Sequence, residues 1–178
     1  MTDAAAFAGV LRAARRICIV GHSGAGKSTL ARQLGPLLGL PVTHLDALFW
    51  QPGWTEPDRD DFARRVADVV ASDRWIIDGG YGKTLAPRLA RAEAVVWLDY
   101  PVPLLAWRVF RRWRTWRGRT RPDMGAGCPE KIDFEFAHWV LFAARSNRRM
   151  LGRLLATQMN VYCARRPREL ENLMSHLR

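Results

Sequence analysis

One segment near the N-terminus, GHSGAGKST at positions 21 to 29, constrains the fold more than any other part of the sequence. It fits the pattern G-x-x-x-x-G-K-[ST], which forms a phosphate-binding loop where a buried strand precedes it and a helix follows it. The apolar run ICIV precedes the segment, and the run LARQLGPLLG, typical of a helix, follows it. The segment therefore predicts a P-loop within an α/β fold.

Each residue type in this loop has an expected role. Glycines let the backbone curl so that its N–H groups point inward, and the following helix adds its positive N-terminal end. We expect Lys27 to reach the β- and γ-phosphates of ATP, and Ser28 to supply a hydroxyl to Mg²⁺. The alternative is a glycine-rich turn that has no ligand. The residues predicted to bind the nucleotide are Gly21, Ser23, Gly24, Ala25, Gly26, Lys27, Ser28 and Thr29.

The composition fits a single domain over residues 1–178 that binds anions. The chain has 178 residues, 48% of them hydrophobic, and a formal net charge of +11. That charge favours nucleotides, phosphorylated metabolites, nucleic acid or acidic lipid as partners. The cysteines lie far apart, which argues against a disulfide framework or a zinc site. No apolar run is long enough to span a membrane, so we expect a cytoplasmic protein of unspecified oligomeric state.

Apolar runs of strand length alternate with amphipathic stretches of helix length, which is typical of a parallel α/β sheet. We expect strands at 17–20, 41–45, 75–78, 94–99 and 159–163. We expect helices at about 27–38, 58–72, 84–91, 101–116, 131–155 and 167–177. Two segments, 46–57 and 117–130, read as long loops, which in a compact domain are more often functional than accidental.

Three aspartates end predicted strands: Asp46, Asp78 and Asp99. Ligands of open parallel sheets bind beyond the carboxyl ends of the strands, so these carboxylates are candidates for metal or substrate chemistry. We expect Asp78 to hold Mg²⁺, directly or through water, and Asp46 to be a catalytic residue; both are candidates for the base that accepts the proton of an acceptor hydroxyl. A helix cap or a turn residue is the alternative reading for each of them.

Seven arginines lie between Arg108 and Arg121, with no acidic residue among them. A lid over the nucleotide would use such a segment, because its arginines can close on the phosphates and exclude water. We therefore place a lid at about 117–130 and expect catalytic roles for Arg117, Arg119, Arg121, Arg145 and Arg148. Two alternatives stay open. One is a solvated basic face, and the other is a nucleic-acid surface in which tryptophans at 107, 113 and 116 stack on bases.

The sequence resembles a known group, the adenylate-kinase-like P-loop NTPases of the DNA topology modulation protein family. The likeness covers most of the chain. It rests on GHSGAGKSTLARQL, HLDALFWQPGW, WIIDGGYGKTLAPRLARAEAVVWLDYP, WRVFRRW, and GRTRPDMGAGCPE before IDFEFAHWV. The last of these is the most distinctive, since many families share a P-loop.

The resemblance implies a three-layer P-loop NTPase fold: a five-stranded parallel sheet in the order 2-3-1-4-5, flanking helices and an arginine-rich lid. It also implies an acceptor region after the second strand. Lys27 and Ser28 then serve phosphate and Mg²⁺, and Arg145 and Arg148 face the phosphates from the helix after the lid. Adenylate kinases carry a Gly-Phe-Pro-Arg run after the third strand, where this chain has DGGYGK at 78–83, which argues against AMP as the acceptor.

Together these features predict an ATP-dependent kinase, resembling nucleoside monophosphate kinases, that transfers the γ-phosphoryl group to a nucleotide or another small molecule. The alternative is a nucleotide-dependent regulator that binds DNA or RNA through residues 107–121. Steep salt dependence of binding would distinguish that protein from a kinase.

Overall fold

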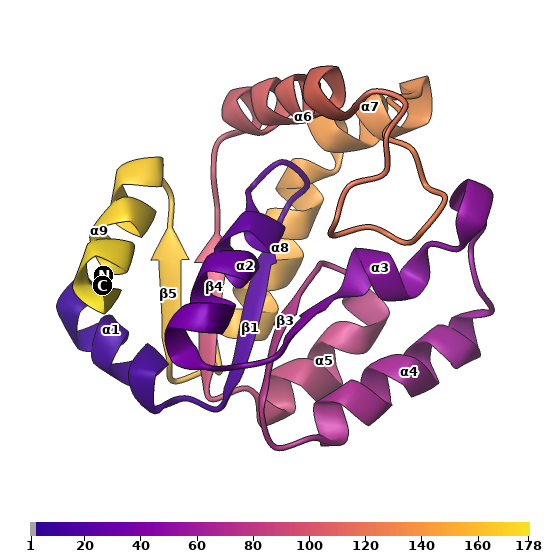
Figure 1. Ribbon diagram of the computed structural model, residues 1–178. Coiled ribbons are helices and arrows are strands. Elements are labelled where there is room, and N and C mark those ends of the chain that lie inside the picture. Colours follow the sequence, from indigo (N-terminus) through magenta and orange to yellow (C-terminus); the bar gives the residue numbers. More distant parts are fainter. Residues whose placement is uncertain (1–2) are drawn as a thin grey trace.

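The computed structural model describes residues 3–178 and contains a five-stranded sheet in the order β2-β3-β1-β4-β5 (Figure 1). All four strand pairings are parallel. The predicted sheet and its order are therefore confirmed. The strands are β1 Arg16–Gly21, β2 Val42–His44, β3 Trp75–Asp78, β4 Ala94–Leu98 and β5 Val161–Ala164.

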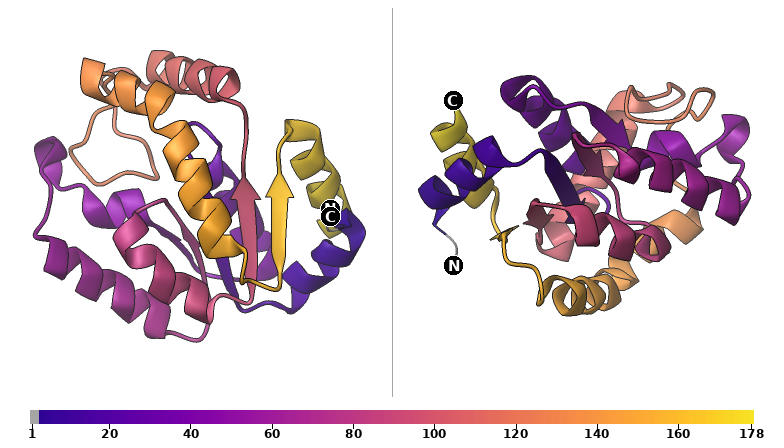
Figure 2. Two further views of the ribbon diagram at one scale, coloured as in Figure 1. Left: turned by 180° about the vertical axis from the view of Figure 1, so that it is seen from behind. Right: turned by 90° about the horizontal axis from the view of Figure 1, so that it is seen from below.

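Helices cover both faces of the sheet. They are α1 Ala4–Ala13, α2 Lys27–Leu38, α3 Leu45–Phe49, α4 Arg59–Ala71, α5 Gly82–Arg91, α6 Val102–Trp116, α7 Phe134–Phe142, α8 Ala144–Leu155 and α9 Pro167–Leu177, with a short 3-10 helix at Pro52–Trp54. The left view of Figure 2 shows α8 lying across the back of the sheet. Among the described residues, no helix is both long and apolar enough to cross a membrane.

The strands alternate their side chains between two cores. Ile17 and Ile19 of β1 belong to the core that contains α1, α2 and α9. Cys18 and Val20, the intervening residues, belong to the other core, where α4, α5 and α8 pack. The central strand is thus buried on both faces, which fixes the position of the loop that leaves its carboxyl end.

The N-terminal helix α1 was not predicted, because arginines interrupt its apolar sequence. The Asp3 carboxylate accepts hydrogen bonds from the backbone of Ala5 and Ala6 and so caps the helix. Phe7 and Leu11 are fully buried, and the Phe7 ring stacks on Tyr162 with 5.3 Å between centroids. Arg12, the one arginine of α1, is exposed, so the helix is amphipathic.

The single helix predicted for residues 131–155 is two helices. The first of them, α7, begins at Phe134, and the Asp133 side chain accepts a hydrogen bond of 2.8 Å from Phe136 N. α7 and α8 meet at Ala143, whose ψ of −11° departs from the helical value. Within the predicted loop 46–57, α3 and the 3-10 helix also form. More of the 46–57 segment is therefore helical than the sequence predicted.

Candidate active site

The P-loop connects β1 to α2 and requires glycine at two positions. Gly24 has a φ of 80°, and a Cβ there would lie 2.5 Å from Leu105 O. Gly26, with a φ of 92°, is the residue before α2. The left-handed backbone at both positions favours glycine, and α6 packs directly on the loop. These features fit a cradle of backbone N–H groups at a helix N-terminus, as a phosphate group requires.

The Lys27 side chain turns back over the loop, and its ammonium donates to His22 O over 3.1 Å. Burial lowers its pKa, whereas the charges of Asp46 and Asp78 act in the opposite direction. The guanidinium groups of Arg112 and Arg121 also act on this ammonium. The P-loop lysine thus lies near two predicted carboxylates and one predicted lid arginine. Such a mixture of charges suits the phosphates of a nucleotide together with a metal ion.

His22, the second residue of the motif, ties the loop to the helices behind it. Its ring stacks on Trp139 at 4.3 Å, Nε2 lies 3.1 Å from Val140 O, and Nδ1 lies 3.0 Å from the Asn147 amide nitrogen. Burial lowers its pKa, so the ring is neutral: Nε2–H donates to Val140 and Nδ1 accepts from Asn147. Sequence reasoning missed this residue, because the motif leaves its position unspecified.

Arg108 braces the same loop from α6. Its Nη1 donates to Ala25 O over 3.1 Å, and its guanidinium lies 4.9 Å from the centre of the Tyr100 ring. One arginine of the predicted cluster therefore supports the P-loop backbone.

Asp46 lies on the short helix α3 and is held by a tyrosine. Tyr81 Oη donates to Asp46 Oδ1 over 2.8 Å. Burial, followed by the Asp46 charge, raises the pKa of Tyr81 far above its ordinary value, so the hydroxyl remains a donor. The Tyr81 ring also packs on Phe49 and Phe62, at 4.9 and 5.0 Å between centroids. Asp46, one of the two candidate bases, is thus oriented by a hydrogen bond from a residue that is itself fixed by packing.

Arg88 holds the turn that carries Tyr81. The residue is fully buried, and its guanidinium donates to the carbonyl oxygens of Gly79 at 3.0 Å and Gly80 at 2.5 Å. Its Nε donates to Thr84 O over 3.0 Å. A buried arginine that binds carbonyls fixes a turn of the backbone, here the one between β3 and α5. Its sequence context, a basic residue in an amphipathic helix, gave no sign of this role.

Asp78 ends β3, as predicted, and is 2% exposed. Its Oδ2 lies 3.1 Å from His44 Nδ1 at the end of β2. Burial works against a charged His44, but the hydrogen bond and charge of Asp78 outweigh it and raise the pKa of His44. The side chains at the two strand ends are therefore joined to each other.

The His44 pair predicts a pH dependence of stability. Because its pKa is raised in the folded state, protonated His44 stabilises the fold. This contribution is fully present below the ordinary histidine pKa of 6.5 and is lost as pH rises through the raised value. We expect His44→Asn to lose stability at low pH and little at high pH. Urea unfolding of both proteins from pH 5.5 to 9 measures the difference, and a pH-independent loss would contradict the prediction.

The 117–130 loop is held by buried ion pairs. Arg121, Asp123 and Glu130 are each less than a tenth exposed. Arg121 binds Asp123 at 2.7 Å and Glu130 at 2.6 Å. Arg112 of α6 binds Glu130 at 2.8 Å, and Arg32 of α2 binds Asp123 at 3.1 Å. The network fixes the loop above the P-loop, and Figure 1 shows the loop descending from α6 to α3 before it returns to α7.

The same loop is docked on the segment after α3. Gly125 lies so close that a Cβ there would be 1.9 Å from Trp50 O. The loop is therefore joined to the segment that was predicted to form the acceptor region. Hydrogen bonds join Gly53 N to Gly127 O at 2.9 Å, Trp54 Nε1 to Pro129 O at 2.9 Å and Cys128 Sγ to Gln51 O at 3.1 Å.

Gly125→Ala is expected to release the loop, because the added Cβ cannot coexist with the Trp50 carbonyl at this distance. Hydrogen exchange of residues 117–130 is then expected to accelerate at least tenfold, while exchange in the sheet is unchanged. Gly80→Ala is the control. Its added Cβ meets nothing within 4 Å, and its backbone is not left-handed. Equal acceleration in both variants would show that the Trp50 contact is not what holds the loop.

Shikimate kinases are among the known proteins similar in sequence to this chain. It is 27% identical over 140 residues to the shikimate kinase of Novosphingobium aromaticivorans, covering 68% of this chain and 69% of that protein. It is 34% identical over 105 residues to the shikimate kinase of Gloeobacter violaceus, covering 51% of this chain and 59% of that one. No family model matches the chain.

Two solved structures resemble it over most of their length. Shikimate kinase from Acinetobacter baumannii, solved in complex with shikimate, matches with a TM-score of 0.58 and 19% identity, over 96% of this chain and 94% of that one. A gluconokinase from Sinorhizobium meliloti matches with a TM-score of 0.52 and 17% identity, over 91% and 90%. The chain has the P-loop kinase fold. These similarities support an ATP-dependent phosphotransferase and do not specify its acceptor.

The P-loop kinase fold accounts for the predicted sheet order and for the loop between β1 and α2. The resemblance to DNA topology modulation proteins remains a prediction, because no family model matches the chain. Specificity of the nucleoside monophosphate kinase type is likewise a prediction.

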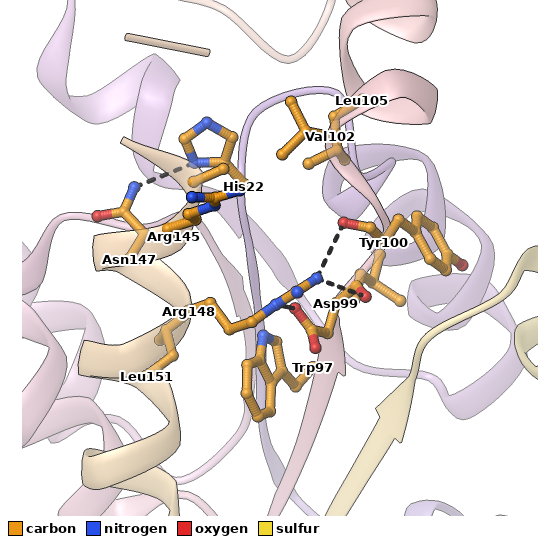
Figure 3. Close-up of a pocket in the computed structure, with 12 residues that line it drawn as sticks. His22, Trp97, Asp99, Tyr100, Val102, Leu105, Arg145, Asn147, Arg148 and Leu151 are labelled. Carbon is orange, nitrogen blue, oxygen red and sulfur yellow. Dashed lines mark hydrogen bonds and ion pairs between the residues drawn. The ribbon is translucent and has the colours of Figure 1, made fainter. Parts of the chain in front are cut away.

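Within this fold the predicted catalytic arginines separate into three groups. Arg121 is buried beside Lys27 and engaged by carboxylates. Arg117 and Arg119 are exposed, and the Arg117 guanidinium lies 5.3 Å from the centre of the Trp113 ring. The other two, Arg145 and Arg148, line a pocket behind the P-loop, next to His22 (Figure 3).

In that pocket Arg148 Nε binds Asp99 Oδ1 at 2.6 Å. Figure 3 shows this pair beside Trp97, with Arg145 nearer to His22. Asp99, considered above for metal or substrate chemistry, therefore has an ion-pair partner from α8. The structure brings Arg121 to the P-loop lysine and places Arg148 with Asp99.

Proposed function

We propose that the protein transfers the γ-phosphoryl group of Mg·ATP to a hydroxyl group of a small, anionic acceptor. The observation that carries this proposal is the meeting of three groups at the carboxyl edge of the sheet. They are the P-loop ammonium of Lys27, the carboxylate of Asp46 and the hydroxyl of Tyr81 that orients it. A phosphate-binding cation beside a fixed base is what in-line transfer to a hydroxyl requires.

In this proposal Lys27 and the backbone of the P-loop hold the β- and γ-phosphates, and Arg121 reaches the transferred group from the loop above. Asp46 accepts the proton of the acceptor hydroxyl as its oxygen bonds to the γ-phosphorus, while the bond from that phosphorus to the bridging oxygen breaks and ADP leaves. Ser28 and Asp78 would hold Mg²⁺, which neutralises charge on the phosphates when bound. The docked 117–130 loop excludes water, so that the acceptor and not water is phosphorylated.

The acceptor class follows from charge and from the relatives. The net charge of +11 favours an anionic acceptor. The kinases that the chain resembles act, by name, on shikimate and gluconate, both of them hydroxylated carboxylic acids. We therefore propose a polyhydroxylated carboxylic acid as the first class to test, with nucleoside monophosphates as the second.

The test is a panel of shikimate, gluconate, related hydroxy acids and nucleoside monophosphates, each incubated with ATP and Mg²⁺. The readouts are ADP formed and phosphate mass added to the acceptor. We expect one hydroxy acid to raise ADP formation at least tenfold above the rate without acceptor. If no acceptor raises it above that rate, the kinase proposal is wrong.

Tyr81→Phe is expected to lower kcat about tenfold with little change in the KM for ATP, because Asp46 loses the hydrogen bond that orients it. Tyr162→Phe is the matched control. It removes a hydroxyl that donates to Glu169 O at 2.8 Å, on the α9 side of the sheet. Steady-state kinetics with the acceptor from the panel measures both variants. A Tyr81→Phe enzyme as active as the control would show that the hydroxyl does not position the base.

A second function has one specific observation in its favour. Trp107 and Phe110 on α6 are about half exposed, and their rings lie 6.2 Å apart in a segment rich in arginine. Stacking aromatics among cations suit single-stranded nucleic acid. If single-stranded DNA stimulates ATP hydrolysis and binds with steep salt dependence, a nucleotide-dependent regulator that binds nucleic acid becomes the better-supported function.

A further inference from the structure

The carbonyl oxygen of His22 is shared by the turn of the P-loop and by its lysine. Ala25 N donates to this oxygen over 3.2 Å, and the Lys27 ammonium donates to it over 3.1 Å. The first bond closes the turn of the loop, and the second holds the cation that is expected to bind phosphate. Because both bonds end on one acceptor, a displacement of this carbonyl moves the loop and the ammonium together.

The ring of the same residue is fixed by the junction of α7 and α8, residues 139–147, which we call the α7–α8 corner. His22 is 8% exposed, its ring stacks on Trp139 at 4.3 Å, and Nε2 lies 3.1 Å from Val140 O. On the α8 side of the corner, Nδ1 lies 3.0 Å from the amide nitrogen of Asn147, and Figure 3 shows this contact as a dashed line. One side chain of the P-loop is therefore held by two helices.

The contact with Val140 serves the end of a helix as well as the loop. Val140 lies in the last turn of α7, which ends at Phe142, and the last carbonyls of a helix lack donors from its own backbone ladder. Nε2–H of His22 supplies a donor to one of them. Val140 is 2% exposed, and a buried carbonyl that loses its donor is destabilising. The contact thus stabilises the corner and the loop at once.

We propose that His22 couples the nucleotide site to the α7–α8 corner, so that the position of the corner controls how tightly the P-loop binds nucleotide. The inference rests on the proposed binding of ATP by this loop. His22 is a positioning residue, because it acts through Lys27 and the loop backbone. Coupling between two sites is reciprocal, so a nucleotide that fixes the loop also stabilises the corner.

The competing role for His22 is to fill space between the P-loop and α7. His22→Phe separates the two roles, because it keeps a ring to stack on Trp139 and removes both nitrogen contacts. Asn147→Leu removes one of these contacts from the α8 side and leaves the P-loop sequence intact. Asn160→Leu is the matched control. It removes an amide that donates to Glu93 O at 3.0 Å, at the amino end of the sheet, opposite the P-loop.

The experiment uses the full chain, with ADP as the probe. Calorimetry in EDTA gives the Kd of metal-free ADP, and hydrogen exchange with and without ADP gives the protection of residues 139–147. We expect ADP to slow exchange at the corner about threefold or more in the wild type. His22→Phe and Asn147→Leu are each expected to weaken ADP binding by about tenfold and to abolish this protection.

A double-mutant cycle tests whether the two residues act as one unit. We expect the protein with both substitutions to bind ADP no more weakly than His22→Phe alone. Asn160→Leu is expected to leave the ADP affinity and the protection of the corner as in the wild type. Urea unfolding of each variant measures stability separately. A purely structural role would lower the free energy of unfolding but leave the ADP-dependent protection of the corner intact.

Three results would overturn the coupling: wild-type ADP affinity in both single variants, losses that add in the double variant, or a wild-type corner that exchanges equally with and without ADP. Should His22→Phe fail to fold, Asn147→Leu carries the test, and an unchanged ADP affinity in that variant would count equally against the proposal. A wild type that binds no ADP would contradict the proposed function as well. Phosphoryl transfer itself is tested only by the acceptor panel, because no acceptor is present here.

Discussion

Replacing Lys27 with alanine is expected to lower kcat by about 10²–10³-fold while the protein stays folded. The ammonium lies among the charges of Asp46, Asp78, Arg112 and Arg121, where it would bind the phosphates of ATP. Burial lowers the pKa of Lys27, which means that keeping this side chain charged destabilises the folded state. Removing it therefore costs activity and does not cost stability.

Acceptor-dependent ADP formation measures the first effect, and urea unfolding measures the second. Lys83→Ala is the control, because Lys83 is exposed on α5. It is expected to keep activity within twofold of the wild type. A Lys27→Ala protein that retains a tenth or more of wild-type turnover would remove the P-loop from the mechanism.

Arg88→Leu is expected to lower the free energy of unfolding by about 3 kcal/mol or more, because buried carbonyl oxygens lose charged donors. The guanidinium serves the carbonyls of Gly79, Gly80 and Thr84 from a fully buried position. We also expect lower kcat, since the turn that it holds carries Tyr81.

Urea unfolding with circular dichroism measures this loss. Arg111→Leu, the same substitution at an exposed position of α6, is expected to change stability by less than about 0.5 kcal/mol. An Arg88→Leu protein as stable as this control would show that the turn does not depend on the arginine. Neither outcome depends on the identity of the acceptor.

The sequence was sufficient to predict the sheet and the loop at its centre, because the P-loop motif fixes a strand, a turn and a helix together. Asp78 was found for a similar reason, since a carboxylate directly after a buried strand has to lie at the edge of the sheet. The order of the strands came from the family resemblance. Periodicity alone reveals each strand but not its neighbours.

The remainder of the site could not be read from the sequence, because it depends on contacts between distant segments. Seven arginines in one segment showed excess charge, but not that Arg121 would bind Asp123 and Glu130, or that Arg108 would bind the P-loop. Arg88 is a further case. Nothing local distinguishes a fully buried arginine from the solvated ones around it in a chain with this composition.

In the proposed kinase, the docking of the 117–130 loop on the segment that follows α3 would give the nucleotide and acceptor sides of the site one common wall. The hydrogen bond between Gly53 N and Gly127 O lies on this wall, as does the contact of Gly125 with the Trp50 carbonyl. An acceptor large enough to displace this segment would also pull the loop away from α2, to which the Arg32–Asp123 ion pair joins it. Rejection of oversized acceptors and protection of ATP from hydrolysis would then depend on the same contacts.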